Sequence, residues 1–205
     1  MSNRKVYFLI NGILTLPGNV NAWTDNAEAW IEGNTPYKAT RMEYACGVLT
    51  RRFRQNDRVN DLELVCKKYE KERLVLVAHS NGCDMVLRLL MKRSLIFDHI
   101  HLIAGACESD FKKNGLNDAL QLDQVKKLSI YWSPNDSALK KARLSSILLS
   151  WIGLGYGYLG LTGAKNLNQS QSHKVNSIEK AWDHSDWFKP ENFENTMKLV
   201  VGATV

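Results

Sequence analysis

The sequence of 205 residues lacks several features that would assign a function directly. Its four cysteines form no Cys-x-x-Cys pair, and its histidines show no metal-ligand spacing with cysteine or carboxylate residues. We therefore expect no metal site and no cofactor. The cysteines are predicted to be free, mostly buried thiols in a reducing compartment. They are Cys46, Cys66, Cys83 and Cys107.

Targeting, repeat and linker signals are also missing. Residues Met1 to Lys5 lead into only five apolar residues before Asn11-Gly12, which is too short for a signal peptide. We therefore expect a cytoplasmic protein. Without a repeat, a linker or a low-complexity tract, residues 1–205 are predicted to form a single domain, and this length is sufficient to bury a full core.

The charge of the chain is basic, with a formal net charge of +6 at pH 7. Short basic clusters are typical of solvated helix faces, and no nucleic-acid motif accompanies them, so we expect no nucleic-acid partner. The clusters are Arg51-Arg52-Phe53-Arg54, Lys67-Lys68 and Lys140-Lys141-Ala142-Arg143.

One long segment, Leu144 to Ala164, carries no charge and contains five glycines, Trp151, Tyr156 and Tyr158. Its length would reach across a bilayer, but the glycines make a poor spanning helix. An interfacial patch with weak membrane-surface contact is a second possibility. We favour a third, an insertion folded over a site or into the core, because the alternation of strands and helices resumes after it.

The stretch Leu74 to Gly82 organises the remainder of the chain. Four apolar residues, Leu74 to Val77, predict a strand buried on both faces, and Asp84 to Arg93 has the pattern of a helix packed on a sheet. Between them, Ala78-His79-Ser80-Asn81-Gly82 places Ser80 on a sharp strand-to-helix turn. This small-x-Ser-x-Gly pattern resembles the nucleophile elbow of the α/β-hydrolases, with Ala78 where glycine is commoner. The alternative is an ordinary turn with a helix-capping serine.

Strands and helices are predicted to alternate along the chain. This order indicates a three-layer α/β/α sandwich with a mostly parallel six-stranded sheet. The other predicted strands are Val6–Ile10, Tyr37–Tyr44, His99–Gly105, Leu128–Trp132 and His173–Glu179. The other predicted helices are Asp25–Ile31, Val48–Tyr69 (with a break near Gln55), Leu116–Val125, Leu139–Ser150 and Glu191–Val201.

We expect the acid and the base that would act with Ser80 to follow it in the chain, because the resemblance implies the order serine, acid, histidine. Ser133-Pro134-Asn135-Asp136 is a polar turn after a predicted strand, and His184 lies on a loop after the last one. We therefore predict Asp136 as the acid and His184 as the base. Both lie at carboxyl ends of strands, where ligands bind in open α/β sheets.

Alternatives remain for each of these roles. Asp136 could be a turn or cap residue, and other residues of the same types occur nearby. The rival acids are Glu108 and Asp110, and the rival bases are His173 and His79. Asp183 and Asp186 flank His184 and could orient its loop, whereas His101 is expected to face the core. We expect His79 to shape the pocket, because neighbouring side chains at such a turn diverge.

An oxyanion hole is predicted from two backbone N–H groups. One is that of Asn81, at the start of the helix after Ser80, and the other is that of Ile13, in the loop after the first strand. Asn11-Gly12-Ile13 resembles the His-Gly stretch of many lipases, with Asn11 in place of histidine. The alternative is a plain turn.

Together these motifs resemble the α/β-hydrolase superfamily over nearly the whole chain. The resemblance is to small members that lack the first two strands of the full sheet, including bacterial and phage hydrolases of undefined function. It implies a Ser80–His184–Asp136 triad that hydrolyses a small-molecule or lipid-like ester through an acyl-enzyme. A binding or regulatory protein on an inactive scaffold is the alternative, and a thioesterase, acyltransferase or peptidase would use the same triad.

Overall fold

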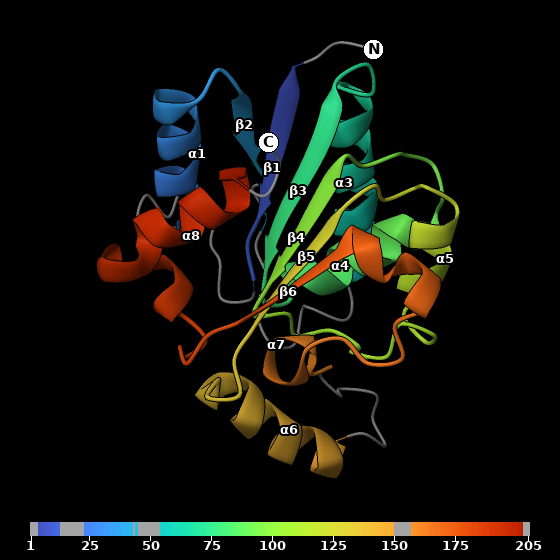
Figure 1. The fold of residues 1–205 in the computed structure, drawn as a ribbon, viewed down its shortest axis with the longest axis vertical. Helices are drawn as coiled ribbons and strands as arrows, with labels where there is room; N and C mark the ends of the chain where they lie inside the picture. Colours follow the sequence, from blue (N-terminus) through green and yellow to red (C-terminus); the bar gives the residue numbers. More distant parts are fainter. Residues whose placement is uncertain (1–3, 13–22, 43, 45–53, 150–156, 203–205) are drawn as a thin grey trace.

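A single sheet of six strands forms the centre of the computed structural model, which describes residues 4–12, 23–42, 44, 54–149 and 157–202 (Figure 1). The strands are β1 (Lys5–Ile10), β2 (Lys38–Arg41), β3 (Arg73–His79), β4 (His99–Ile103), β5 (Leu128–Trp132) and β6 (Val175–Glu179). Their order is β2-β1-β3-β4-β5-β6, and every neighbouring pair is parallel. The predicted α/β class is confirmed, and the sheet is wholly parallel in the described part.

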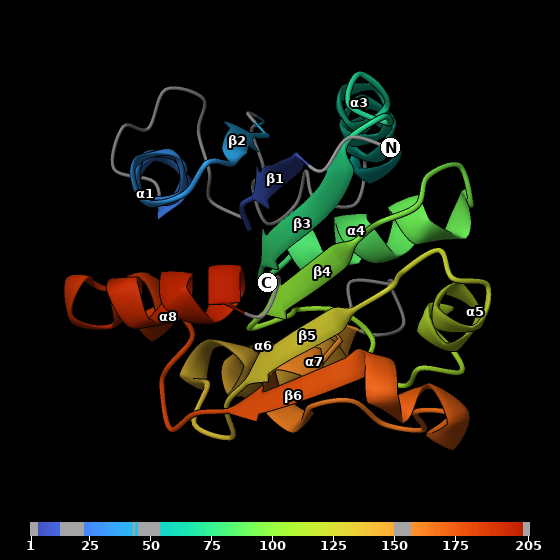
Figure 2. The ribbon, with the colours of Figure 1, turned by 45° about the horizontal axis from the view of Figure 1, so that its top comes forward.

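Helices cover both faces of the sheet (Figures 1 and 2). One face packs against α1 (Trp23–Asn34) and α8 (Pro190–Gly202), and the other packs against α3 (Gln55–Lys67), α4 (Gly82–Met91) and α5 (Leu116–Gln121). Because side chains alternate along a strand, Leu74 and Leu76 of β3 join the core under α3 and α4, whereas Val75 and Val77 join the core under α1 and α8. The predicted three-layer sandwich is therefore confirmed.

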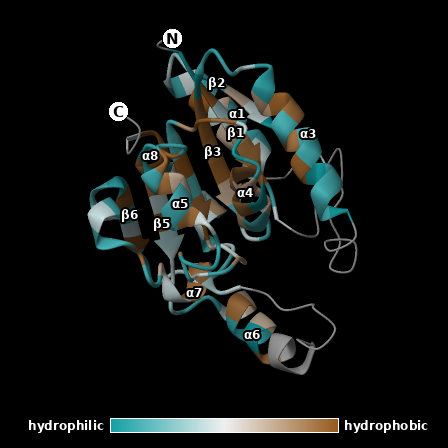
Figure 3. Cartoon of the chain, turned by 90° about the vertical axis from the view of Figure 1, so that its right-hand side faces the viewer, coloured by the Kyte–Doolittle hydropathy of each residue, from teal (hydrophilic) through white to brown (hydrophobic). Residues whose placement is uncertain are grey.

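The carboxyl ends of the strands meet two further helices, α6 (Ser137–Leu149) and α7 (Leu159–Thr162). Hydrogen bonds tie α7 to the strand ends: the Gly160 N–H donates to the Gly105 carbonyl at 2.9 Å, and the Ser133 N–H donates to the Gly160 carbonyl at 2.8 Å. Figure 3 shows α6 extending away from the body of the molecule, with apolar and polar residues mixed along it. None of the helices in the described ranges is long and apolar enough to cross a membrane.

Several predicted boundaries were wrong. The helix predicted for Val48–Tyr69 occupies only Gln55–Lys67 within the described residues, and residues 45–53 lie outside them. The helix predicted for Leu116–Val125 ends at Gln121, because Asp123 takes a positive φ of 55°. The strand predicted from His173 begins at Val175, because Gln169–Lys174 forms a 3-10 helix, η2.

The second strand is also shorter than predicted. The expected strand over Tyr37–Tyr44 has only the four residues of β2, which pair with β1 from Val6 to Leu9. Two short elements were not predicted at all: α7 and the 3-10 helix η3 (Asp186–Phe188). Elements of three or four residues carry too few positions to show a periodic pattern.

Candidate active site

Ser80 lies on the turn between β3 and α4, at the carboxyl edge of the sheet. Its φ is 56°, a left-handed backbone conformation that non-glycine residues adopt rarely. The turn is held by the Ser80 N–H, which donates to the Ile103 carbonyl at 3.0 Å, and by the Ser80 carbonyl, which accepts from the Ala106 N–H at 3.0 Å. Such strain at a defined turn is typical of a nucleophile elbow.

Glycines at two positions allow the close packing around this turn. A Cβ atom on Gly82 would lie 2.5 Å from the Asn11 carbonyl oxygen and 2.8 Å from that of Ile10. A Cβ atom on Gly12 would lie 2.8 Å from the Ser80 Cβ. The first helical turn of α4 and the end of β1 can therefore approach each other only because both positions lack a side chain.

Gly82→Ala is expected to lower the free energy of unfolding by at least about 2 kcal/mol, because the clash is with backbone that cannot rotate away. Urea unfolding checks this value. Gly33→Ala is the matched control, since a Cβ on Gly33, also in a helix, meets nothing within 4 Å. That substitution should stabilise the protein by about 0.5–1 kcal/mol through helix propensity. Equal stability changes in the two variants would contradict the packing argument.

His184 lies on the loop between β6 and η3, and it joins the other two predicted residues. Its Nε2 is 3.0 Å from the Ser80 Oγ, and its Nδ1 is 2.7 Å from the Asp136 Oδ2. Asp136 follows β5, and its side chain is only 1% exposed. Its second oxygen, Oδ1, accepts the Leu139 N–H at 2.8 Å. The structure thus brings together three residues that are up to 104 positions apart in the sequence.

This arrangement fixes the protonation geometry of the imidazole. A carboxylate can only accept, so Nδ1 carries the hydrogen that it donates to Asp136, and Nε2 presents its lone pair to the Ser80 hydroxyl. The hydroxyl then donates to Nε2. Ser80 is consequently positioned to lose its proton to His184 when it attacks an electrophile.

The other carboxylates considered from the sequence, which are the two that flank His184 and the two rival acids, make different contacts. The Asp183 carboxylate accepts from the N–H and hydroxyl of Ser137 at 2.7 and 2.8 Å and from the His184 N–H at 2.7 Å. Asp186 accepts the Asp183 N–H at 2.8 Å. Both therefore orient the loop that carries His184. Glu108 and Asp110 act in the turn after β4, where Glu108 accepts the Asp110 N–H at 3.0 Å.

His173 and His101 lie in other parts of the structure. His173 is exposed in η2, which precedes β6 and so lies at the opposite edge of the sheet from Ser80. His101 is fully buried in β4, as expected, and its Nδ1 lies 2.9 Å from the Tyr131 hydroxyl.

His79 packs beside His184. Its Nε2 lies 3.1 Å from the His184 carbonyl oxygen, to which a neutral imidazole donates. Its ring makes edge contacts with Trp23 and Phe188, and these two rings stack on each other at 4.0 Å. Burial, and secondly the neighbouring His184, lower the pKa of His79 to about 3. His79 therefore stays neutral and anchors the His184 loop, a contact that sequence reasoning missed.

The predicted oxyanion hole lies only partly within the residues that the structure describes. Asn81 follows Ser80 at the amino end of α4 and is fully buried, whereas Ile13 lies outside the described residues. The Asn11 Oδ1 accepts the Gly12 N–H and the Trp23 indole N–H, each at 2.9 Å. Asn11 therefore shapes the turn beside Ser80 through its side chain, a role that its sequence position alone did not reveal.

The cysteines near this site are packed, not exposed. Cys83 lies in the first turn of α4, with its Sγ 3.3 Å from the Ala78 carbonyl oxygen. A hydrogen bond with Cys83, together with burial, holds the pKa of the Cys107 thiol well above its usual value. Burial raises the pKa of Cys66 to about 12, and Cys46 lies outside the described residues. Among the described residues, no three His, Cys, Asp or Glu side chains gather as metal ligands.

At the sequence level, no protein-family model matches this chain, and neither does any curated protein. The fold is similar to solved structures over nearly its whole length. An α/β serine hydrolase homologue from Coxiella burnetii has a TM-score of 0.56 at 13% identity. The match covers 100% of this chain and 88% of the homologue's chain. A "predicted CIB-like hydrolase" from Thermoplasma acidophilum has a TM-score of 0.56 at 16% identity. The match covers 99% of this chain and 87% of that hydrolase's chain.

A third structure has the same arrangement. Mouse α/β hydrolase domain-containing protein 10 has a TM-score of 0.51 at 13% identity, covering 97% of this chain and 88% of its own. Identities this low show a shared fold alone. The strand order, the helices on both faces and these similarities give one conclusion: the chain has the fold of the α/β-hydrolase superfamily.

Proposed function

We propose that the protein is a serine hydrolase that cleaves a carboxylic ester through an acyl-enzyme on Ser80. The observation that carries the proposal is the continuous hydrogen-bonded series from Asp136 through His184 to Ser80, with distances of 2.7 and 3.0 Å. Each residue lies on a different loop of the carboxyl edge. Packing alone does not require this combination of an acceptor, an imidazole and a strained serine.

In the proposed reaction, the Ser80 Oγ attacks the ester carbonyl carbon as its proton passes to the His184 Nε2. The carbonyl oxygen becomes an oxyanion, which the N–H groups of Asn81 and Ile13 would bind. Collapse of this intermediate breaks the bond to the alcohol oxygen, and the alcohol leaves with the proton from Nε2. The product of this half-reaction is an ester of Ser80.

Deacylation repeats the same steps with water. His184 takes a proton from the water as its oxygen attacks the acyl carbon, and it returns that proton to the Ser80 Oγ when the acid departs. Throughout, Asp136 holds the imidazole in one tautomer. It also stabilises the imidazolium that forms once during acylation and once during deacylation. One well-placed oxyanion donor would contribute about 3–4 kcal/mol to transition-state stabilisation.

Labelling with a fluorescent fluorophosphonate tests the nucleophile. Wild-type protein should be labelled at Ser80, and Ser80→Ala and His184→Ala should each abolish the label, because phosphonylation needs both nucleophile and base. The two variants should also lower kcat for p-nitrophenyl butyrate about 10⁴- to 10⁶-fold.

Ser170→Ala is the matched control, since Ser170 is exposed in η2. It should be labelled and active like the wild type, with folding of every variant verified by circular dichroism. Folded wild-type protein that takes no label and hydrolyses none of the p-nitrophenyl esters would overturn the proposal and favour a binding protein on an inactive scaffold.

A further inference from the structure

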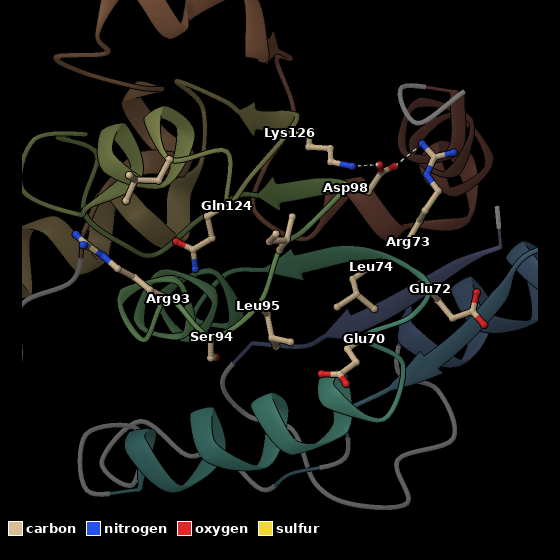
Figure 4. A pocket seen from close by; sticks show the side chains of 12 residues that line it. Glu70, Glu72, Arg73, Leu74, Arg93, Ser94, Leu95, Asp98, Gln124 and Lys126 are labelled. Atoms are coloured by element: carbon tan, nitrogen blue, oxygen red, sulfur yellow. Dashed lines mark hydrogen bonds and ion pairs between the residues drawn. The ribbon is translucent and has the colours of Figure 1, made fainter. Parts of the chain in front are cut away.

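A hollow of about 460 Å³ lies at the amino edge of the sheet, at the opposite end of β3 from Ser80 (Figure 4). The segments that lead into β3, β4 and β5 line it. Leu74 and Leu95 are buried in its lining, whereas Ile96 and Leu122 are 56% and 58% exposed. Large apolar side chains that remain exposed around one hollow are typical of a protein–protein interaction site.

One group of charges at this hollow is already paired within the chain. The Asp98 carboxylate lies 2.7 Å from the Arg73 guanidinium and 3.9 Å from the Lys126 ammonium, as Figure 4 shows. Both of these cations therefore have an anionic partner. Three further charged residues belong to the lining of the hollow: Glu70, Glu72 and Arg93.

These three charges are separated by sign. Figure 4 shows Arg93 at one end of the hollow and Glu70 and Glu72 at the other, with apolar side chains between them. The sheet order gives the same separation. Both glutamates lead into β3, whereas the Arg93 guanidinium points toward Asp118 of α5, the helix that precedes β5, and β4 lies between these two strands. The hollow therefore has an anionic end and a cationic end.

Both ends can accept a further charge. The Arg93 guanidinium lies 3.6 Å from the Asp118 carboxylate, but both side chains are largely exposed, and such a surface pair contributes little to stability. Within the described part of the chain, neither Glu70 nor Glu72 has an ion-pair partner, and the Oε2 of Glu72 is buried without a hydrogen bond. An anion near Arg93 and a cation near the two glutamates would therefore complete the contacts of this hollow.

We infer that this surface binds the same surface of a second copy of the chain and forms a two-fold symmetric dimer. A two-fold axis across the middle of the hollow, at right angles to the line from Arg93 to Glu70, places Arg93 of each copy against Glu70 of the other. Two ends of opposite charge around an apolar centre are thus self-complementary, as an isologous interface requires. Both Ser80 sites stay open in this dimer, because they lie at the opposite edge of the sheet.

Sedimentation equilibrium tests for this dimer at protein concentrations up to about 200 μM, because small interfaces give weak complexes. The average mass should rise from the chain mass of 23.3 kDa toward twice that value. Because the ion pairs between the copies lie near the surface, Kd should increase with added salt. A wild-type protein that keeps the mass of one chain over this concentration range would overturn the inference.

Charge reversal identifies the two residues that meet across the interface. Arg93→Glu and Glu70→Arg should each raise Kd at least about 30-fold, because symmetry makes both ion pairs repulsive in either variant. In an equimolar mixture of the two variants, each contact again joins a cation to an anion, so a heterodimer should form with a Kd near that of the wild type. A mixture that stays monomeric, or single variants that dimerise like the wild type, would overturn this arrangement.

Ile96→Asp tests the apolar centre, because Ile96 lies in the segment before β4, between the two charged ends. It should also raise Kd at least about 30-fold, since the interface would bury an unpaired carboxylate. Leu64→Asp is the matched control: Leu64 is 60% exposed on α3 but does not line the hollow, so its Kd should match the wild type. Urea unfolding verifies that both variants are folded. A dimer that Ile96→Asp leaves intact would overturn the proposed interface.

Discussion

Asp136→Asn is expected to lower kcat for ester hydrolysis about 10⁴-fold, with a much smaller change in KM. The Asp136 Oδ2 accepts the hydrogen on the His184 Nδ1 at 2.7 Å, and an amide can instead present its NH₂ group to that nitrogen. The imidazole would then carry its hydrogen on Nε2 and could no longer accept the Ser80 proton. Initial rates on p-nitrophenyl butyrate measure the loss.

Asp183→Asn provides the matched control, because Asp183 is adjacent to His184 but bonds its backbone N–H instead of its ring. The asparagine oxygen can still accept that N–H, so we expect a loss of kcat of no more than about tenfold. Both variants should unfold at urea concentrations near that of the wild type. Equal losses of kcat in the two variants would show that Asp136 is not the group that orients His184.

The central features could be predicted because they depend on rules that act locally or along a parallel sheet. Leu74 to Gly82 carries its own strand, turn and helix signals, and the structure has all three. Asp136 and His184 each follow a predicted strand, and carboxyl ends of parallel strands meet at one edge. A sequence signal at each of three loops was therefore enough to place three distant residues together.

Contacts without a local signal could not be predicted. The hydrogen bond from His79 to the His184 carbonyl joins residues 105 positions apart, and its existence depends on how the last loop folds back over the turn. The approach of Gly12 to Ser80 likewise depends on β1 pairing with β3, a choice that neither strand's pattern encodes. The pattern of a single sequence predicts whether a segment is a helix or a strand more reliably than it predicts which elements that segment packs against.

The position of η2 illustrates a different limit. His173 and Lys174 were predicted to begin the last strand, but Lys174 instead extends its ammonium to the Leu120 carbonyl at 2.7 Å and to the Asp123 carboxylate. Asp123 has a positive φ in the turn after α5. Tertiary contacts of this kind override the preference of two residues for a strand.

The buried histidines make the folded state sensitive to acid, and the sign of the effect follows from their lowered pKa values. Burial is the main reason that the pKa of His79 falls to about 3 and that of His101 well below its ordinary value of 6.5. The unfolded chain therefore binds protons at a higher pH than the folded chain. The contribution of these histidines to the free energy of unfolding is fully present above pH 6.5. It is lost as the pH falls from 6.5 toward the pKa values of the folded state.

Between pH 7 and pH 4.5, the titration of His79 alone should lower the free energy of unfolding by about 2.5 kcal/mol, and His101 should add to this loss. Urea unfolding at pH 7, 6, 5 and 4.5 measures it. Hydrogen bonds with Lys67 and Lys92 lower the pKa of Glu63 to about 2. The effect of Glu63 on stability therefore falls below this pH window.

His79→Phe isolates the contribution of one histidine, because phenylalanine keeps a ring against the stacked pair of Trp23 and Phe188 but cannot take up a proton. Its stability should be lower than that of the wild type at pH 7, since the hydrogen bond to the His184 carbonyl is gone, yet it should fall less steeply with acid. His173→Gln, at an exposed position, should follow the wild-type curve. A His79→Phe curve with the wild-type slope would mean that His79 is already accessible to protons in the folded state. The anchoring of the His184 loop by a neutral His79 would then be wrong as well, because both conclusions depend on the same buried imidazole.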